Sequence, residues 1–245
     1  MKRIFTTLSQ KWPEYLLEIL VLIIGIYGAF ALEEWNEDRE KKKKEQTILL
    51  ALKGEFENNL EQLNLVIETN ATNIKSANEF ASEISPNATQ LDERDLAMLW
   101  DKTFKVEAIY RPGTGVVTEA INSGSISLVQ NGELRKKLSA IDAEIQELKF
   151  QEETVFQFRM ECYNHLRENG NFRKILDHTS EIETWYQLSK SEFDTSNLFL
   201  LQSNQFENDL LLFIGTSVYL ENKFLIPMRS NIEHTLLLIN TQLEE

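Results

Sequence analysis

An uninterrupted apolar segment near the start of the chain places the strongest constraint on its fold. Residues 15–32 read YLLEILVLIIGIYGAFAL and contain one charged side chain, that of Glu18. Such a segment forms about 27 Å of α-helix, close to the hydrocarbon thickness of a bilayer. Trp12, Tyr15 and Trp35 bracket it at the two levels where aromatic rings meet lipid headgroups. The sequence therefore predicts a helix over residues 15–35 that spans the lipid bilayer and is anchored by these three aromatic residues.

A cleaved secretory signal is the competing interpretation of this segment. Three basic residues precede it, and Ala29-Phe30-Ala31 has the small-x-small form of a cleavage site. However, the apolar run is longer than an ordinary signal core and contains Glu18, and helical sequence continues past Ala31 without a break. These features favour a retained anchor.

The small residues of the segment suggest a second role for it. Glu18, Leu22, Gly25 and Ala29 share one helical face, and Gly25-x-x-x-Ala29 is a pattern that lets two membrane helices approach closely. Glu18 also fits a simpler role, in which its carboxylate reaches from one turn inside the span to the headgroups. Both interpretations stay open.

Basic residues flank the segment on both sides. Three precede it, and five follow it at Arg39 and Lys41–Lys44. The second group follows four acidic residues, and long domains cross membranes largely regardless of their charge. The count of basic residues alone favours a C-terminal domain on the cytoplasmic side, whereas these two considerations favour a cytoplasmic N-terminus, which is the orientation that we expect. The four lysines fit either contact with an anionic leaflet or an ordinary solvated helix surface.

Residues that break helices are scarce along the chain. The 245 residues include 9 Gly and 4 Pro, where average usage gives about 17 and about 12. This composition disfavours β-sandwiches and barrels, which need many turns. After the span, apolar residues recur every three or four positions with no proline before Pro86, at Leu49, Leu52, Phe56, Leu60, Leu63, Ile67, Ala71 and Ile74. The membrane helix is predicted to continue as an amphipathic stalk over residues 36–85.

Two further long helices are predicted in the second half of the chain. Asn131 caps the first, whose heptad seam comprises Leu134, Leu138, Ile141, Ile145, Leu148 and Val155. Glu152 and Arg159 interrupt this seam. The second runs over residues 204–243 with a kink at Pro227, and its apolar positions include Phe224, Leu236 and Leu243. Residues 111–115 are expected to be a connector.

The predicted fold class is therefore all-α. A tail of residues 1–14 and a single N-terminal transmembrane helix lead into the stalk, and an antiparallel helical bundle with coiled-coil segments follows over residues 86–245. The seam permits pairing within one chain or between two chains.

Charge and motifs exclude several classes of function. The chain carries a formal charge of −14, and residues 45–245 hold 17 basic and 32 acidic residues, or −15. Such a surface repels phosphate backbones, so we expect no nucleic-acid partner. His165, His178 and His234 match no metal-ligand spacing, and the sequence has no nucleophile or phosphate-loop motif. We expect no enzyme, no cofactor and no metal. The single Cys162 fits a buried apolar residue or an intermolecular bridge.

Two stretches of the sequence resemble an uncharacterised family of bacterial single-pass membrane proteins. The first comprises residues 17–26 with the junction EWNEDR at residues 34–39, and the second comprises INSG at residues 121–124 with residues 128–138. The resemblance implies a helical domain anchored in the bacterial inner membrane. It supplies no activity, substrate or catalytic residue.

These features predict a membrane-anchored interaction or scaffolding protein. Its partners would be the bilayer and either a second copy of the chain or another helical membrane protein. The alternative is an anchored sensor, whose bundle binds a small ligand or protein and transmits a conformational change through the stalk.

Overall fold

The computed structural model describes residues 2–244, apart from the side chains of residues 2–11, 13–15 and 181, and this part of the chain contains helices and no strand. The prediction of an all-α fold is confirmed. The α-helices are α1 (Lys2–Ser82), α2 (Glu93–Phe104), α3 (Gly115–Asn122), α4 (Gly132–Asn169), α5 (Phe172–His178), α6 (Glu181–Thr184), α7 (Asn204–Leu220) and α8 (Ile226–Glu244). Two 3-10 helices, η1 (Ser125–Leu128) and η2 (Leu198–Gln202), and a π-helix, η3 (Glu221–Leu225), complete them.

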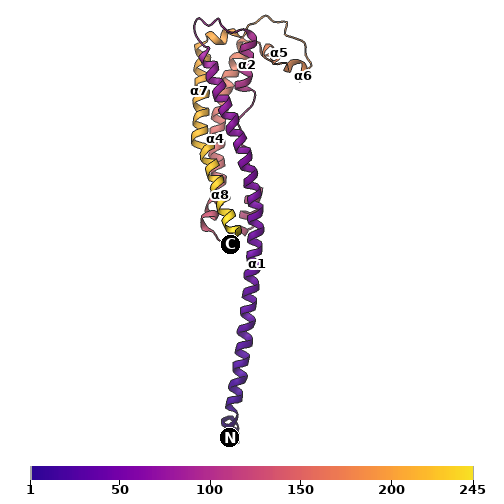
Figure 1. Ribbon diagram of the computed structural model, residues 1–245, viewed down its shortest axis with the longest axis vertical. Coiled ribbons are helices and arrows are strands. Elements are labelled where there is room, and N and C mark those ends of the chain that lie inside the picture. Colours follow the sequence, from indigo (N-terminus) through magenta and orange to yellow (C-terminus); the bar gives the residue numbers. More distant parts are fainter. Residues whose placement is uncertain (1, 245) are drawn as a thin grey trace.

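Helix α1 runs the whole length of the molecule (Figure 1). Its 81 residues correspond to about 120 Å of helix. The N-terminal half projects alone, whereas the C-terminal half lies along α7 and α8 and ends beside α2. A long apolar helix thus continues without a break into a helical bundle, as predicted.

The second half of α1 is a bundle helix from Glu45 onward. Its buried residues recur at alternating steps of four and three, beginning with Glu45, Leu49, Leu52 and Phe56. The apolar ones pack against α8 and α4 in a shared core. The segment expected as a stalk, residues 36–85, therefore comprises a short exposed stretch followed by a helix that forms one wall of the bundle.

The predicted apolar stripe of α1 is displaced by one residue at three positions. Leu60 and Ile74 are only half-buried and Ala71 is exposed. The structure buries the preceding residues instead, Asn59, Asn70 and Asn73. Amides are tolerated there because each donates a hydrogen bond to a backbone carbonyl, so the cost of burying a polar group is offset.

Helices α4, α7 and α8 form the antiparallel hairpin that the sequence predicts. Three contacts join α4 to α7 and α8, namely His165 with Asp209, Gln151 with Thr216, and Glu144 with Asn231. The residue numbers decrease along α4 as they increase along α7 and α8, so the two segments are antiparallel. Five residues of the predicted seam are buried in the core shared with α1 and α8, and Val155 is half-buried beside them. The seam therefore pairs within one chain.

The π-helix η3 shifts the apolar stripe of the last helical segment. Pro227 has no N–H, and its ring displaces the carbonyl four residues earlier, so the preceding turn widens from α to π. The step between buried residues lengthens to five, from Leu220 to Leu225. The predicted position Phe224 is consequently only half-buried. Beyond Pro227, Ile232 and Ile239 are buried, whereas the predicted positions Leu236 and Leu243 are half-buried.

A second core of aromatic side chains closes the end of the bundle that lies farthest from the N-terminus. Trp100 and Phe104 of α2 lie 4.6 Å apart between ring centroids, and Phe80 of α1 lies 5.2 Å from Phe206 of α7. Cys162 is fully buried in the same cluster, which fits an apolar structural role. This core fixes α2 against α1, α4 and α7.

Two leucines of α1 provide a matched test of this packing. Leu52 is fully buried, whereas Leu50 is 61% exposed. We expect Leu52→Ala to lower the free energy of unfolding by about 2–5 kcal/mol because it leaves a cavity in the core. Leu50→Ala should change it by less than about 0.5 kcal/mol. Urea unfolding followed by circular dichroism measures both, and equal effects would contradict the packing of α1 described above.

Candidate functional site

The apolar half of α1 has no protein covering it. Every residue from Leu16 to Lys44 is exposed, and the large apolar side chains between Leu16 and Trp35 are 44–74% exposed. Moving one such side chain out of water is worth about 1.5–3 kcal/mol. A continuous apolar surface of this length is typical of a helix that faces lipid.

The exposed stretch of α1 has two parts that differ in composition. Its first part is apolar up to Leu32, and Glu33 begins a run rich in charged residues. The stretch ends where Glu45 enters the bundle. The charged run therefore separates the apolar surface from the bundle by about three turns of helix.

A second helical stretch, Asn204–Glu244, is also long and apolar enough to cross a membrane by length and composition. A third of its most apolar window is buried inside the bundle, whereas none of the window in α1 is. Leu210, Leu220 and Ile232 of this stretch belong to the two cores. Its apolar character is therefore explained by core packing.

The predicted anchor residues lie on the exposed half of α1. Trp12 and Trp35 are both exposed at the two ends of the apolar segment. Tyr15 lies in α1 between them, but its side chain falls outside the described residues. The aromatic rings of Trp12 and Trp35 are available to the two headgroup levels of a bilayer.

The predicted helix-packing face points away from the bundle. Glu18, Leu22, Gly25 and Ala29 are all exposed, and a Cβ atom added at Gly25 would meet nothing within 4 Å. Each of the four lies 27 residues before one of the buried residues at positions 45, 49, 52 and 56. Because 27 residues make about 7.5 turns of α-helix, the two faces lie on opposite sides of α1.

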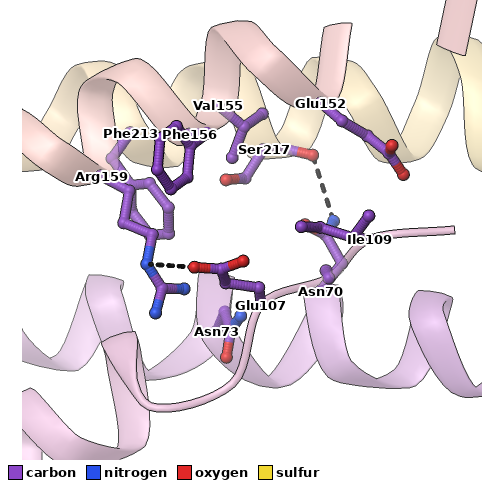
Figure 2. Close-up of a pocket in the computed structure, with 11 residues that line it drawn as sticks. Asn70, Asn73, Glu107, Ile109, Glu152, Val155, Phe156, Arg159, Phe213 and Ser217 are labelled. Atoms are coloured by element: carbon purple, nitrogen blue, oxygen red, sulfur yellow. Dashed lines mark hydrogen bonds and ion pairs between the residues drawn. The ribbon is translucent and has the colours of Figure 1, made fainter. Parts of the chain in front are cut away.

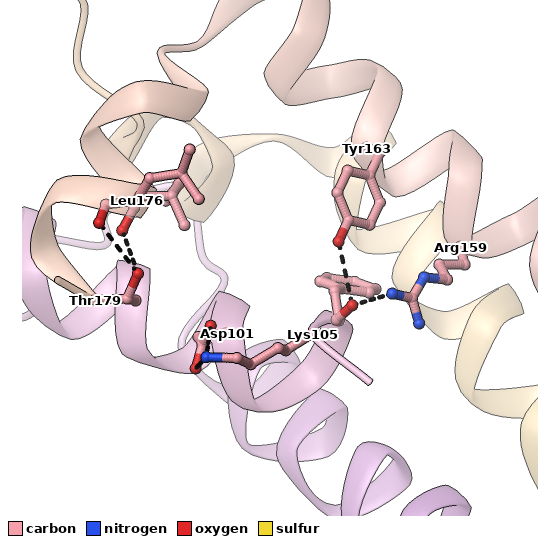
Figure 3. Close-up of polar contacts among 8 residues, drawn as sticks. Asp101, Lys105, Arg159, Tyr163, Leu176 and Thr179 are labelled. Atoms are coloured by element: carbon pink, nitrogen blue, oxygen red, sulfur yellow. Dashed lines mark hydrogen bonds and ion pairs between the residues drawn. The ribbon is translucent and has the colours of Figure 1, made fainter. Parts of the chain in front are cut away.

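A cluster of polar side chains, which we call the clamp, holds the connector between α2 and α3. Asn73 donates to Val106 O at 2.9 Å, and Glu152 accepts from Tyr110 N at 2.7 Å. Arg159 and Tyr163 both donate to the carbonyl of Phe104 (Figure 3). The connector therefore bridges α1 and α4 through hydrogen bonds to its backbone.

Two more residues of α1 hold the far end of the connector. Asn59 exchanges two hydrogen bonds with Gly113, each 2.8 Å long. Glu55 accepts from Val116 N at 2.8 Å and Val117 N at 3.2 Å, which satisfies free N–H groups in the first turn of α3. The clamp accounts for Asn59 and Asn73 in the stripe of α1 and for Glu152 and Arg159 in the seam of α4, whereas Asn70 binds Ser217 and Glu221 instead.

A small cavity lies beneath the connector (Figure 2). Its volume is about 30 Å³, which accommodates about two water molecules. Asn70, Glu107, Glu152, Arg159 and Ser217 contribute to its polar lining. Arg159 Nε lies 3.8 Å from Glu107, and the buried Ser217 Oγ has no hydrogen-bond partner among the described residues.

Among the clamp residues, Glu152 has a carboxyl group with a strongly shifted pKa. Burial raises its pKa from 4.5 to about 7, although the hydrogen bond from Tyr110 N and the charges of Lys149 and Arg111 oppose the shift. At neutral pH this carboxyl is therefore partly protonated. In the sequence, Glu152 is recognisable only as a polar residue that interrupts an apolar seam. That interruption is the one sequence feature that points to the clamp.

Two of the histidines each pair with one carboxylate, and the cysteine is buried. His165 Nε2 lies 2.7 Å from Asp209, and His234 Nε2 lies 3.7 Å from Glu133. No group of three or more His, Cys, Asp or Glu side chains in this part of the chain could hold a metal ion. Burial raises the pKa of the Cys162 thiol, which disfavours the reactive thiolate.

Comparison with known proteins places the chain in a family. The model of a family of unknown function, DUF6090, matches residues 18–157. The chain belongs to this family. The matched part runs from the apolar segment to α4 and includes the clamp residues Glu55, Asn59, Asn73 and Glu152. No curated protein and no solved structure matches the chain.

The raised pKa of Glu152 makes a pH-dependent prediction. Its carboxyl binds a proton more tightly in the folded chain than in the unfolded chain, so its contribution to stability is full below pH 4.5 and is lost as the pH rises through about 7. Glu152→Gln keeps an acceptor for Tyr110 N but removes the titration. We expect the variant to gain on the order of 3 kcal/mol relative to the native chain between pH 4.5 and pH 8.

Urea unfolding midpoints measured from pH 4.5 to pH 8 test this expectation. Glu153→Gln is the matched control, because Glu153 is the exposed neighbour on the same helix. Parallel pH profiles for the native chain and Glu152→Gln would contradict the prediction.

Proposed function

We propose that the chain is a membrane-anchored interaction or scaffolding protein without catalytic activity, which crosses the bacterial inner membrane once through residues 15–35 and self-associates. The observation that carries this proposal is the uncovered apolar half of α1, whose large side chains are exposed. The tail with its three basic residues lies on the cytoplasmic side, in accordance with the charge preference of short flanking segments.

The continuity of α1 supports a scaffolding role. Trp35 and Glu45 are ten residues apart, so the bundle begins about 15 Å beyond Trp35. Ser82 lies 47 residues beyond Trp35, or about 70 Å. An unbroken helix holds the bundle at a set distance from the bilayer, which suits a protein that presents a surface to partners.

The outward face of the span supports self-association. Leu22, Gly25 and Ala29 lie on the side of α1 opposite the bundle, so two spans can meet there without displacing it. Two copies in one bilayer share the same orientation, which makes their contact parallel and two-fold symmetric. The two acidic bundles then lie on outer sides of the pair, where their repulsion is smallest.

The cavity beneath the connector does not supply the ligand pocket that the sensor alternative requires. Its volume of about 30 Å³ is far below the roughly 300–1,000 Å³ of pockets that bind organic ligands. Two of its lining residues, Asn73 and Glu152, are engaged in holding the connector.

Membrane insertion is tested by charged substitutions in the span. Leu20→Arg combined with Ile24→Arg should release the chain from membranes at alkaline pH, because each Arg costs about 2.5–3.5 kcal/mol at the centre of a span. Leu211→Arg combined with Leu237→Arg places the same charges on exposed residues of the bundle and should leave the chain in the membrane. Retention of the first variant would contradict the proposed anchor.

Self-association is tested by two glycines of the span. Gly25→Ile places a branched side chain on the outward face, and we expect it to reduce dimer formation in lipid vesicles by about tenfold, as measured by energy transfer between labelled copies. Gly28→Ile is the control, since Gly28 lies about 90° from the centre of that face. If both variants associate like the native chain, the outward face is not the interface.

A further inference from the structure

An exposed group of apolar side chains lies at the end of the bundle farthest from the span. The segment of residues 180–196, which we call the distal loop, contains α6 and projects beside α5 (Figure 1). Trp185 and Phe193 are 78% and 77% exposed, and Tyr186 and Leu188 are about half exposed. This density of uncovered aromatic residues is typical of the centre of protein interfaces.

The backbone of the distal loop is held in place although its side chains are uncovered. Asn171, which is buried, donates to Phe193 O at 3.1 Å and to Ser191 Oγ at 2.8 Å. Leu188 N donates to the carbonyl of Ile182 at 3.2 Å. The ring of Phe193 is therefore presented to solvent by a fixed backbone.

The loop is anchored to the bundle by a pair of buried amides. Asn171 N donates to Asn197 Oδ1 at 2.7 Å, and Asn197 Nδ2 donates to Asn171 O at 3.0 Å. Gly170 permits this close approach, because a Cβ atom there would lie 2.8 Å from Asn197 Oδ1. Asn197 N also donates to Glu93 of α2 at 3.0 Å, which joins the end of the loop to the helix that carries Trp100 and Phe104.

Backbone strain accompanies the exposed aromatic residues. Ser180 and Gln187 have φ angles of 61° and 52°, and they are the non-glycine residues with positive φ in the described chain. They flank Trp185 and Tyr186 on either side. Left-handed conformations of residues other than glycine are costly and concentrate at functional sites.

We propose that the distal loop is a docking site for a partner protein that offers an apolar pocket bordered by Lys or Arg side chains. Glu183, Glu192 and Asp194 are exposed around the aromatic residues and form no ion pair within the described chain. Lys190, the basic residue of the loop, is paired with Asp177 at 3.6 Å. An acidic border around an aromatic centre is complementary to a basic border around an apolar pocket.

The same charges disfavour other occupants of the loop. Anionic lipid headgroups and a second distal loop both carry negative charge and would be repelled. The inference goes beyond the proposed self-association and uses none of the residues of the span. Its test can therefore fail while the span still dimerises, and the reverse also holds.

Site-specific photocrosslinking of the full chain in the membranes of its native cell tests the proposal. A photoreactive phenylalanine analogue replaces Trp185 or Phe193, and the control replaces Leu237, an exposed residue of α8. We expect positions 185 and 193 to give an adduct with the same protein, through a peptide rich in Lys or Arg, and position 237 to give none. Mass spectrometry identifies the crosslinked peptides.

Charge reversal supplies the decisive comparison. The combination of Glu183→Lys, Glu192→Lys and Asp194→Lys should lower the yield of this adduct at least about tenfold, with unchanged thermal unfolding because all three residues are exposed. An unchanged yield would overturn the proposal. So would adducts with lipid, adducts with a second copy of the chain, or the absence of any adduct.

Discussion

The structure depends on one helix whose two halves have different surroundings. Helix α1 is apolar on all sides between Leu16 and Leu32 apart from Glu18, and from Glu45 onward it buries only a single stripe. No break separates the two parts. The rotation of the bundle relative to the apolar half of α1 is therefore set by helical phase, since the exposed apolar residues and the residues that face the core belong to one unbroken helix.

The clamp shows how the bundle gains a defined arrangement from polar residues. Asn59, Asn73, Glu152 and Arg159 are buried polar residues in otherwise apolar stripes. Each binds the backbone of the connector, which has no regular hydrogen bonding of its own. Their contribution is to fix one path for residues 105–114 between α1 and α4, because any other path would leave buried polar groups unpaired.

Sequence periodicity predicted the helices well and their buried faces less well. The cap Asn131, the long α4 and the distortion near Pro227 all follow from local rules and are present. The buried amides of α1 were missed, because their partners lie between 33 and 151 residues away in sequence. An argument that assumes a constant helical period cannot predict the widened turn at η3, so Phe224 was assigned to the core.

The packing of the heptad seam inside the bundle limits the surfaces through which two copies of the chain could contact each other. Leu134, Leu138 and Leu148 are buried against α1 and α8, so this seam cannot serve a second chain unless the bundle opens. The bundle surface is strongly acidic, which opposes contact between two bundles. The apolar segment of residues 15–32 contains a single charged residue, Glu18, and its outward face carries Gly25 and Ala29. In the proposed dimer the two copies therefore meet through the apolar segment of α1, and the bundle surface is left free.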